Sequence, residues 1–473
     1  MVDQLRVANA GLREVIDAQA AQLEAQAGRI AELERRLGAD STTSNRPPSA
    51  DSPYRKPAPR SSRRASGRTP GKQPGQPGTT MPLIDAPDEV VVLDPGSCTG
   101  CGSDLGDAPV SGVQRRQVTD VVPPPLPRVT EYQLITRICR GCAATTCAPA
   151  PAVAPARAQY GASVLARAAE LTCAHYLPIA RATALIGSLL GVPVSTGFTA
   201  GVRARAARLL EMTFLPRVRE LLTQVGVLHA DETPGRAEGG LSYVHVACTE
   251  YLTAMHTGGR AKTDIDAGGV LPGYAGTIVR DGYAGYAHLI DAAHAWCGAH
   301  LLRELRATHA ADPDRQFWAA AMADTLTDAH HRAEGARADG HDRIDDTTLA
   351  GIVNRYRGAT AAGISDNTNR VGSADRDALR LARRFRQHEA MILRFVVDLA
   401  VPWTNNQAER DIRPVKIQQR TSGGCWRTLA GLADFAVVRS YLSTATKWGI
   451  ETLDAFERLF TTGAWLPPAA TPC

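Results

Sequence analysis

The sequence lacks any hydrophobic run long enough to cross a membrane, since no stretch of about 18 consecutive apolar residues occurs in its 473 residues. Residues 1–6 lead into no apolar segment, so we expect no secretory signal peptide. These absences argue against a secreted or membrane protein. We therefore expect a cytoplasmic protein that does not use a membrane as a partner.

The chain also lacks a strong excess of charge of either sign, with 53 Lys and Arg against 48 Asp and Glu and a net charge of +5. This balance alone is weak evidence for a polyanionic partner. The distribution is uneven, because residues 41–80 hold eight basic residues and one acid, Asp51. This segment is rich in Pro, Ser and Gly and cannot bury enough apolar surface to order itself. It fits both a solvated linker and a basic arm along DNA phosphates.

A chain of 473 residues is too long for one core, so we expect two or three domains. Residues 1–40 predict a helix with heptad spacing. Two sets of residues, each spaced seven positions apart, would form the contact seam of a coiled coil. They are Leu5, Leu12, Gln19, Gln26 and Leu33, and Asn9, Ile16, Leu23, Ile30 and Leu37. This pattern is typical of a coiled coil with a polar position at Asn9. A helix packed on its own protein fits too, but the polar linker leaves it no nearby core, which favours a homo-oligomer.

The ten cysteines are not expected to form a disulfide framework, since the chain is long and carries no secretion signal. Two pairs, Cys98 with Cys101 and Cys139 with Cys142, have the spacing of zinc knuckles, each with a glycine in the turn. Four thiolates leave no open position, so the zinc would be structural. Reduced surface cysteines are the alternative. We expect a zinc-binding domain at 81–150, with short strands at 89–93 and 132–136 that lead towards the pairs.

Residues 160–224 are rich in Ala, Leu and Arg and predict helices, interrupted at Gly191-Val192-Pro193. Ser195 or Thr196 is a suitable N-cap for the helix that follows. That helix carries Arg203, Arg205 and Arg208. A helix, a short turn and a basic helix fit a helix-turn-helix that binds DNA, although any small helical hairpin has the same pattern.

Three acids stand where a metal site would need them. The strand predicted at 225–230 leads to Asp231, the strand at 277–280 leads to Asp281, and Glu409 lies in a polar segment that can form a helix. Strands are also expected at 243–249 and 252–257. Carboxylates suit a pair of Mg²⁺ ions that activate the attacking oxygen and neutralise the leaving oxygen in phosphoryl transfer. A turn or capping role is the alternative for each single aspartate.

At these residues the chain resembles the insertion-sequence-66 family of transposases, which belong to the DDE superfamily. The resemblance is carried by blocks in order, namely Leu177-Pro178-Ile179, His229-Ala230-Asp231-Glu232-Thr233, Asp281-Gly282-Tyr283-Ala284-Gly285-Tyr286, Cys297-Gly298-Ala299-His300 and Asn405-Asn406 with Ala408-Glu409-Arg410. One block departs from the family, because residues 419–426 replace its Lys-Asn and aromatic run. The carry-over of a lysine to Arg420 is therefore in doubt.

The resemblance implies an α/β multidomain protein whose ribonuclease-H-like catalytic core spans 225–440, with a helical insertion at about 301–400 and a helical tail at 441–473. Its catalytic acids would be Asp231, Asp281 and Glu409, with two magnesium ions, or manganese in their place. Arg410, Arg413 and Arg420 would contact DNA phosphates. For Cys297 and His300 we expect packing or orientation of the catalytic region rather than zinc binding. Tyr283 and Tyr286 are expected to pack rather than to stack on bases.

The function that follows is a DNA transposase that binds terminal repeats of double-stranded DNA, cleaves them and joins them to target DNA. It would be nucleoid-associated, and the resemblance adds element-encoded accessory proteins as partners. Two alternatives stay open: a catalytically inactive zinc-dependent DNA-binding protein derived from a mobile element, and a ribonuclease-H-like nuclease or resolvase.

Overall fold

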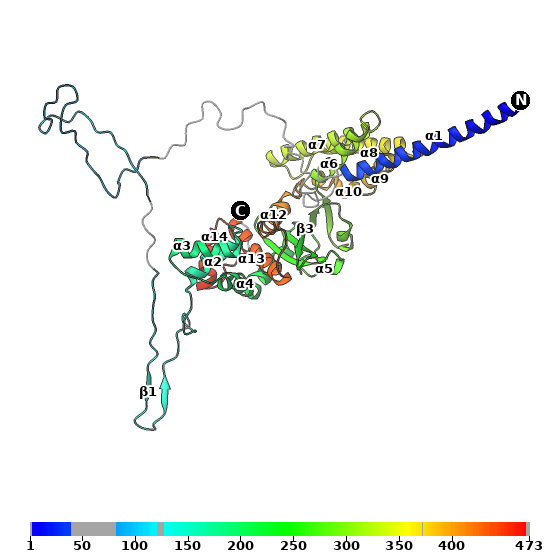
Figure 1. The fold of residues 1–473 in the computed structure, drawn as a ribbon. Helices are drawn as coiled ribbons and strands as arrows, with labels where there is room; N and C mark the ends of the chain where they lie inside the picture. Colours follow the sequence, from blue (N-terminus) through cyan, green and yellow to red (C-terminus); the bar gives the residue numbers. More distant parts are fainter. Residues whose placement is uncertain (1, 39–81, 121–126, 371, 470–473) are drawn as a thin grey trace. The chain divides into compact units, whose positions relative to one another are not determined.

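The computed structural model describes residues 2–38, 82–120, 127–370 and 372–469 (Figure 1). The basic segment at 41–80 lies outside the described residues. The chain divides into two units, Lys56–Leu126 and a second one formed by Met1–Arg55 with Pro127–Cys473. Within the described ranges, no helix is long and apolar enough to cross a membrane.

The N-terminal segment forms the expected helix, α1 (Val2–Gly38), as one continuous element. Ile16, Leu23 and Ile30, from the predicted seam, are each more than half exposed. The helix is therefore confirmed, and its apolar seam is not covered by the described part of the chain. Whether a second copy covers this seam stays a prediction.

The predicted strand at 89–93 is wrong. These residues form no regular element, and Val90 and Val92 are 73% and 81% exposed. A strand needs a neighbour for its backbone groups, and this segment pairs with none of the described residues. Around the second cysteine pair a small antiparallel hairpin forms from β1 (Thr136–Ile138) and β2 (Thr145–Cys147), so the strand expected at 132–136 begins only at its last residue.

The helical region before the sheet contains α2 (Ala162–Cys173), α3 (Ile179–Leu190) and α4 (Thr196–Gln224). Gly191 ends α3 with a φ of 65°, a left-handed conformation that glycine adopts at low cost. The Ser195 hydroxyl accepts a hydrogen bond from the Phe198 backbone N–H and caps α4, as the sequence predicts. α4 packs along α13 (Leu429–Lys447) through side chains such as Phe214, so it is part of the main core.

The central sheet is mixed and has the strand order β5-β4-β3-β6-β7. Its strands are β3 (Val227–Ala237), β4 (Gly240–Cys248), β5 (Thr253–Gly258), β6 (Thr277–Arg280) and β7 (Ala293–Trp296). β3, β4 and β5 are antiparallel neighbours, whereas β6 runs parallel to β3 and β7 runs parallel to β6. Strand β7 was not predicted from the sequence.

Helices lie between the last strands of the sheet and follow its final strand, β7. Between β5 and β7 lie α5 (Lys262–Asp266) and the short helix η2 (Ala284–His288). After β7 come α6 (Gly298–Ala311), α7 (Phe317–Ala338), α8 (Asp346–Asn367), α9 (Ser373–Gln387), α10 (Glu389–Ile392) and α11 (Arg394–Val397). This confirms the helical character expected of about 301–400, and the group has its own core around Trp318 and Phe385.

The last helices return to the sheet. α12 (Asn406–Thr421) packs on β3 and β4, and α13 packs on β5 and α4. α14 (Thr452–Thr461) packs on α2 (Figure 1). Helix α13 continues through residue 440, where we expected the catalytic domain to end, and it is buried on both sides of that position, as at Phe435 and Tyr441.

Candidate active site

The two aspartates are brought level by the parallel pairing of β3 with β6. Leu228 lies opposite Ile278 and His229 lies opposite Val279. The same register, continued by two residues, places Asp231 beside Asp281. Asp281 follows the end of β6 as predicted, but Asp231 does not end its strand. β3 continues to Ala237 because its far half pairs with β4.

The electrostatics of Asp231 show that the acids gather at one place. Burial raises the pKa of Asp231 well above its usual range. The negative charges of Asp281, Glu232 and Glu409 raise that pKa further, in this order. Asp281 and Glu409 are only half-buried, so the cluster opens towards solvent. Carboxylates that repel one another in this way fit a site for divalent cations, whose charge relieves the repulsion.

Asn405 connects the strand of the first aspartate to the helix of the glutamate. The Oδ1 of this buried side chain accepts a hydrogen bond from His229 Nδ1 at 3.0 Å. Its Nδ2 donates to the Ala230 carbonyl oxygen at 2.9 Å. Its own carbonyl accepts the backbone N–H of Glu409 at 3.2 Å at the start of α12. In the sequence Asn405 is only one residue of a motif, and no local pattern indicates this positioning role.

Glu232, next to Asp231, is a fourth carboxylate, with a side chain only 3% exposed, and it has a different role. Arg260 donates to its Oε1 from Nε at 3.0 Å and from Nη2 at 2.7 Å, and the Tyr286 hydroxyl donates to its Oε2 at 2.8 Å. Both oxygens therefore have partners. Arg260 in turn lies 3.7 Å above the centre of the Tyr283 ring. Both tyrosines are in packing contacts, as expected.

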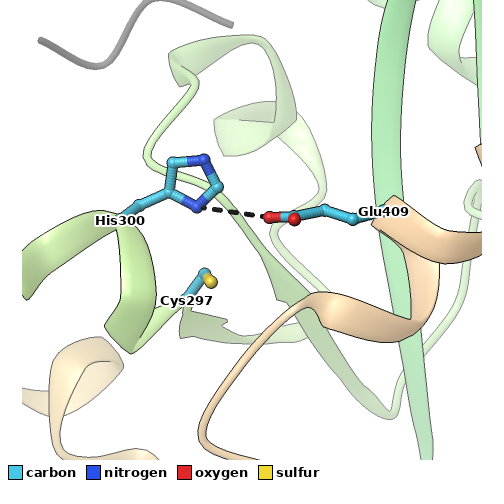
Figure 2. A group of neighbouring side chains, drawn as sticks. All are labelled: Cys297, His300 and Glu409. Atoms are coloured by element: carbon cyan, nitrogen blue, oxygen red, sulfur yellow. Dashed lines mark ion pairs between the residues drawn. The ribbon is translucent and has the colours of Figure 1, made fainter. Parts of the chain in front are cut away.

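Cys297 and His300 also reach this place, from the beginning of α6 (Figure 2). His300 Nδ1 lies 3.8 Å from Glu409 Oε1. Cys297 is buried, and its sulfur accepts a hydrogen bond from the Asn405 backbone N–H at 3.2 Å. One potential ligand atom from each of Cys297, His300 and Glu409 lies within 4.8 Å of the others. The two residues that we expected to pack or to orient the catalytic region thus lie beside the third acid.

Cations follow Glu409 along one face of α12. Arg413, Lys416 and Arg420 are four, seven and eleven residues after Glu409, a spacing that keeps them on its side of the helix. Arg413 and Arg420 are exposed, and Lys416 is half-buried and donates to the Pro234 carbonyl. Burial, and then the charge of Arg420, lowers the pKa of Lys416 to about 8. Lys416 was missed from the sequence, although its helical spacing could have indicated it.

The remaining predicted DNA contacts differ in exposure. Arg410 is exposed and donates to Gln407 Oε1. On α4, Arg205 and Arg208 are exposed, but Arg203 is half-buried, with its guanidinium 5.5 Å from the centre of the Trp426 ring. Arg203 therefore contributes to packing between α4 and the segment before α13.

Each cysteine pair forms a knuckle-like turn by itself. In the first turn, the Cys98 N–H donates to the Ser103 carbonyl and the Gly102 N–H donates to the Cys98 carbonyl. In the second turn, the Cys139 N–H donates to the Ala144 carbonyl and the Ala143 N–H donates to the Cys139 carbonyl. Hydrogen bonds from Ser103 lower the pKa of Cys101, and the Cys142 and Gly141 backbone lowers that of Cys139. Each turn fits half of a zinc site. The pairs lie in different units, so the four sulfurs are not placed relative to one another.

Carboxylates that adjoin a row of cations form a site suited to divalent metal ions and a polyanionic substrate. A model of the Transposase IS66 family matches residues 157–433, more than half of the sequence, and the chain belongs to this family. Its membership indicates a transposase. A family of unknown function (DUF6444) matches residues 1–82. None of the curated proteins compared with the chain matches it.

Proposed function

We propose that this transposase catalyses metal-dependent cleavage of DNA at the ends of an insertion sequence and transfer of the cut strand to target DNA. The observation that carries the proposal is the convergence of Asp231, Asp281 and Glu409, which the raised pKa of Asp231 reports. Asp231 is half-buried and the charges of Asp281 and Glu409 both act on its carboxylate, so it suits the position shared by two ions. Two Mg²⁺ ions, or Mn²⁺, fit the oxygen ligands.

The sheet supports a ribonuclease-H-like core. Three antiparallel strands are followed by two parallel ones, and the strand that bears Asp231 is central in the order. The chain then leaves the sheet after β7, forms α6–α11, and returns with α12 to supply Glu409. This supports our proposal that the helical group is an insertion between the second and third catalytic acids.

The chemistry uses the chain mainly for position and charge. When bound, the metal pair would activate an attacking oxygen and stabilise the leaving oxygen in two successive displacements at phosphorus. Asp231, Asp281 and Glu409 would hold these ions and so keep the reacting groups in line. Asn405 connects the strand of Asp231 to the helix of Glu409 through its hydrogen bonds to the Ala230 carbonyl and the Glu409 N–H. No covalent link between protein and DNA is needed.

DNA binding is proposed for the cations of α12 and for the exposed arginines of α4. Arg413, Lys416 and Arg420 would follow a phosphate backbone away from Glu409, and Arg410 lies beside them. Arg205 and Arg208 on α4 would add contacts to the terminal repeats, whereas Arg203 would act through packing. The residues at 41–80 would contribute as a basic arm, and the four cysteines as a structural zinc module.

We propose that two copies of the chain associate through α1. Its exposed apolar residues suit pairing with the same helix of a second copy, which would bring two element ends together. We also propose element-encoded accessory proteins as partners, and a place on the nucleoid in the cytoplasm.

The test is a strand-transfer assay with purified protein, the element's own terminal DNA, and either Mg²⁺ or EDTA. Mg²⁺-dependent joining that is lost in Asp281→Asn, with end binding retained, supports the proposal. End binding without cleavage, even with accessory proteins added, would instead support an inactive DNA-binding protein. Nicks without joined products would indicate a nuclease.

A further inference from the structure

Cys297, His300 and Glu409 are presented by backbone that is already fixed. Cys297 directly precedes α6, and His300 is in the first turn of that helix, so both side chains share one side of it. The Gly298 N–H donates to the Trp403 carbonyl at 2.9 Å, and the Asn405 N–H donates to the Cys297 sulfur at 3.2 Å. These two hydrogen bonds connect the beginning of α6 to the residues that immediately precede α12.

Cys297 presents its sulfur from a buried position, with 1% of the residue exposed. One potential ligand atom from each of Cys297, His300 and Glu409 lies within 4.8 Å of the other two. A metal ion bound between them would be coordinated by the Cys297 thiolate, because a coordinated thiol loses its proton.

His300 offers an unused ligand atom. Its Nδ1 is buried and has no hydrogen-bond partner among the described residues. The 3.8 Å between this atom and Glu409 Oε1 is too long for a hydrogen bond. It is slightly longer than the roughly 3.3–3.6 Å that separates a nitrogen and an oxygen ligand of one tetrahedral zinc ion with bonds of about 2.0–2.2 Å, so a small side-chain movement would bring both atoms to one ion.

We propose that Cys297, His300 and Glu409 form a binding site for a single Zn²⁺ ion or a similar transition-metal ion, and that this site shares Glu409 with the magnesium pair. Sulfur, nitrogen and carboxylate ligands select zinc over the hard Mg²⁺ ion. Three protein ligands leave a fourth position for water. Figure 2 shows the three side chains turned towards one common point.

The shared residue, Glu409, gives the site a regulatory consequence, which rests on the proposed function. If Glu409 coordinates a zinc ion held by Cys297 and His300, its carboxylate is no longer free to bind Mg²⁺ together with Asp231. Zinc bound here would therefore inhibit magnesium-dependent cleavage, and metal supply would control transposition.

The binding test uses the full chain without DNA or Mg²⁺. Zinc per chain is measured after equilibrium dialysis for the unchanged protein, Cys297→Ser, His300→Asn and the control Cys425→Ser, a half-buried free thiol elsewhere. The cysteine pairs at 98–101 and 139–142 are the same in all four proteins, so any zinc that they bind does not change the difference between the proteins. We expect one zinc fewer in Cys297→Ser and in His300→Asn than in the unchanged and control proteins. Equal zinc content in all four would overturn the site.

Cobalt provides a second readout in the same proteins. The spectrum of the Co²⁺-loaded protein minus that of Cys297→Ser should contain a thiolate-to-cobalt absorption and the visible bands of a tetrahedral ion. Circular dichroism confirms that each variant is folded, and His300→Asn keeps the sulfur if the cysteine variant does not fold. A flat difference spectrum with folded variants refutes coordination by Cys297.

Inhibition is measured separately, with each protein's cleavage expressed relative to its own rate in Mg²⁺ alone. Half-inhibition of Cys297→Ser should need about tenfold more zinc, or more, than that of the unchanged protein. Zinc that binds but does not inhibit would overturn the regulatory consequence only. Absence of cleavage in Mg²⁺ would contradict the proposed function, and the dialysis result would still decide the site.

Discussion

The amide of Asn405 donates a hydrogen bond to the backbone carbonyl of Ala230, the residue immediately before Asp231. Asn405 also precedes α12, so one buried side chain fixes the distance between the strand of the first acid and the helix of Glu409. Asn405→Ala would leave His229 and the Ala230 carbonyl without this partner. We expect a loss of about 2–3 kcal/mol in unfolding free energy, measured by urea denaturation.

The same variant should also need about tenfold more Mg²⁺ for half-maximal cleavage, because displaced acids bind the ions less well. Asn405→Asp, which keeps the shape and loses the donor, should show the magnesium effect as well. Asn406→Ala, at the exposed neighbouring position, is the control. An unchanged magnesium requirement in a destabilised Asn405→Ala would reduce Asn405 to a purely structural role.

The acids could be predicted from the sequence because each sits in a recognisable local pattern, but their surroundings could not. Asp231 was expected at a strand end, and only the pairing with β4 shows that β3 continues. Cys297 meets Asn405 and Glu409 although it is more than one hundred positions away from both, as in its hydrogen bond with Asn405. Local periodicity carries no information about such contacts. For the same reason, the apolar run at 89–93 looked like a strand although it has no partner.

Arg260 should be needed to keep Glu232 ionised inside the protein. Burial already raises the pKa of Glu232, followed by the charge of Asp281, and Arg260 acts against both. In Arg260→Ala the folded-state pKa rises further above the unfolded value. Stability is then lost as pH rises from about the unfolded pKa of 4.3 through the folded one.

We therefore expect Arg260→Ala to be destabilised by about 1–2 kcal/mol at pH 8, a figure reduced because Arg260 is 42% exposed, and by less at pH 5. Chemical denaturation at both pH values measures the difference. The double variant Arg260→Ala with Glu232→Gln is the control and should not show it. A cost that is the same at pH 5 and pH 8 would contradict the electrostatic explanation.

Two buried histidines should make the fold sensitive to mild acid. Burial lowers the pKa of His256 to about 4, with its hydrogen bond to the Asp264 carbonyl opposing the shift, and burial and then Arg280 lower the pKa of His294 to about 4. Their unfolded pKa is about 6.5, so the unfolded chain binds more protons between these values. Above pH 6.5 neither histidine affects the free energy of unfolding through its protonation. As pH falls to about 4, each histidine lowers the free energy of unfolding by roughly 1–2 kcal/mol.

The measurement is the unfolding free energy from pH 7.5 to 4.5, compared between the unchanged protein and His256→Gln, which keeps a donor for the Asp264 carbonyl. The variant should lose less stability on acidification. The difference between the two proteins removes contributions such as that of Asp231, whose raised pKa acts in the opposite direction. His331→Gln, at an exposed position, serves as the control. Parallel pH curves for His256→Gln and the unchanged protein would refute this assignment.

The cationic face of α12 should bind DNA through phosphates and not through bases. Arg413→Ala and Arg420→Ala should each weaken binding to specific and unrelated duplexes alike. Each should also lower the steepness of log Kd against log salt concentration by about one, because one fewer counterion is released. Fluorescence anisotropy from 50 to 200 mM salt measures both effects. Arg332→Ala is the matched control, since Arg332 is a surface arginine already paired with Asp328 at 3.0 Å on α7. If the salt dependence of Arg413→Ala and Arg420→Ala equals that of the control, DNA does not follow this face, and the exposed arginines of α4 become the next surface to test.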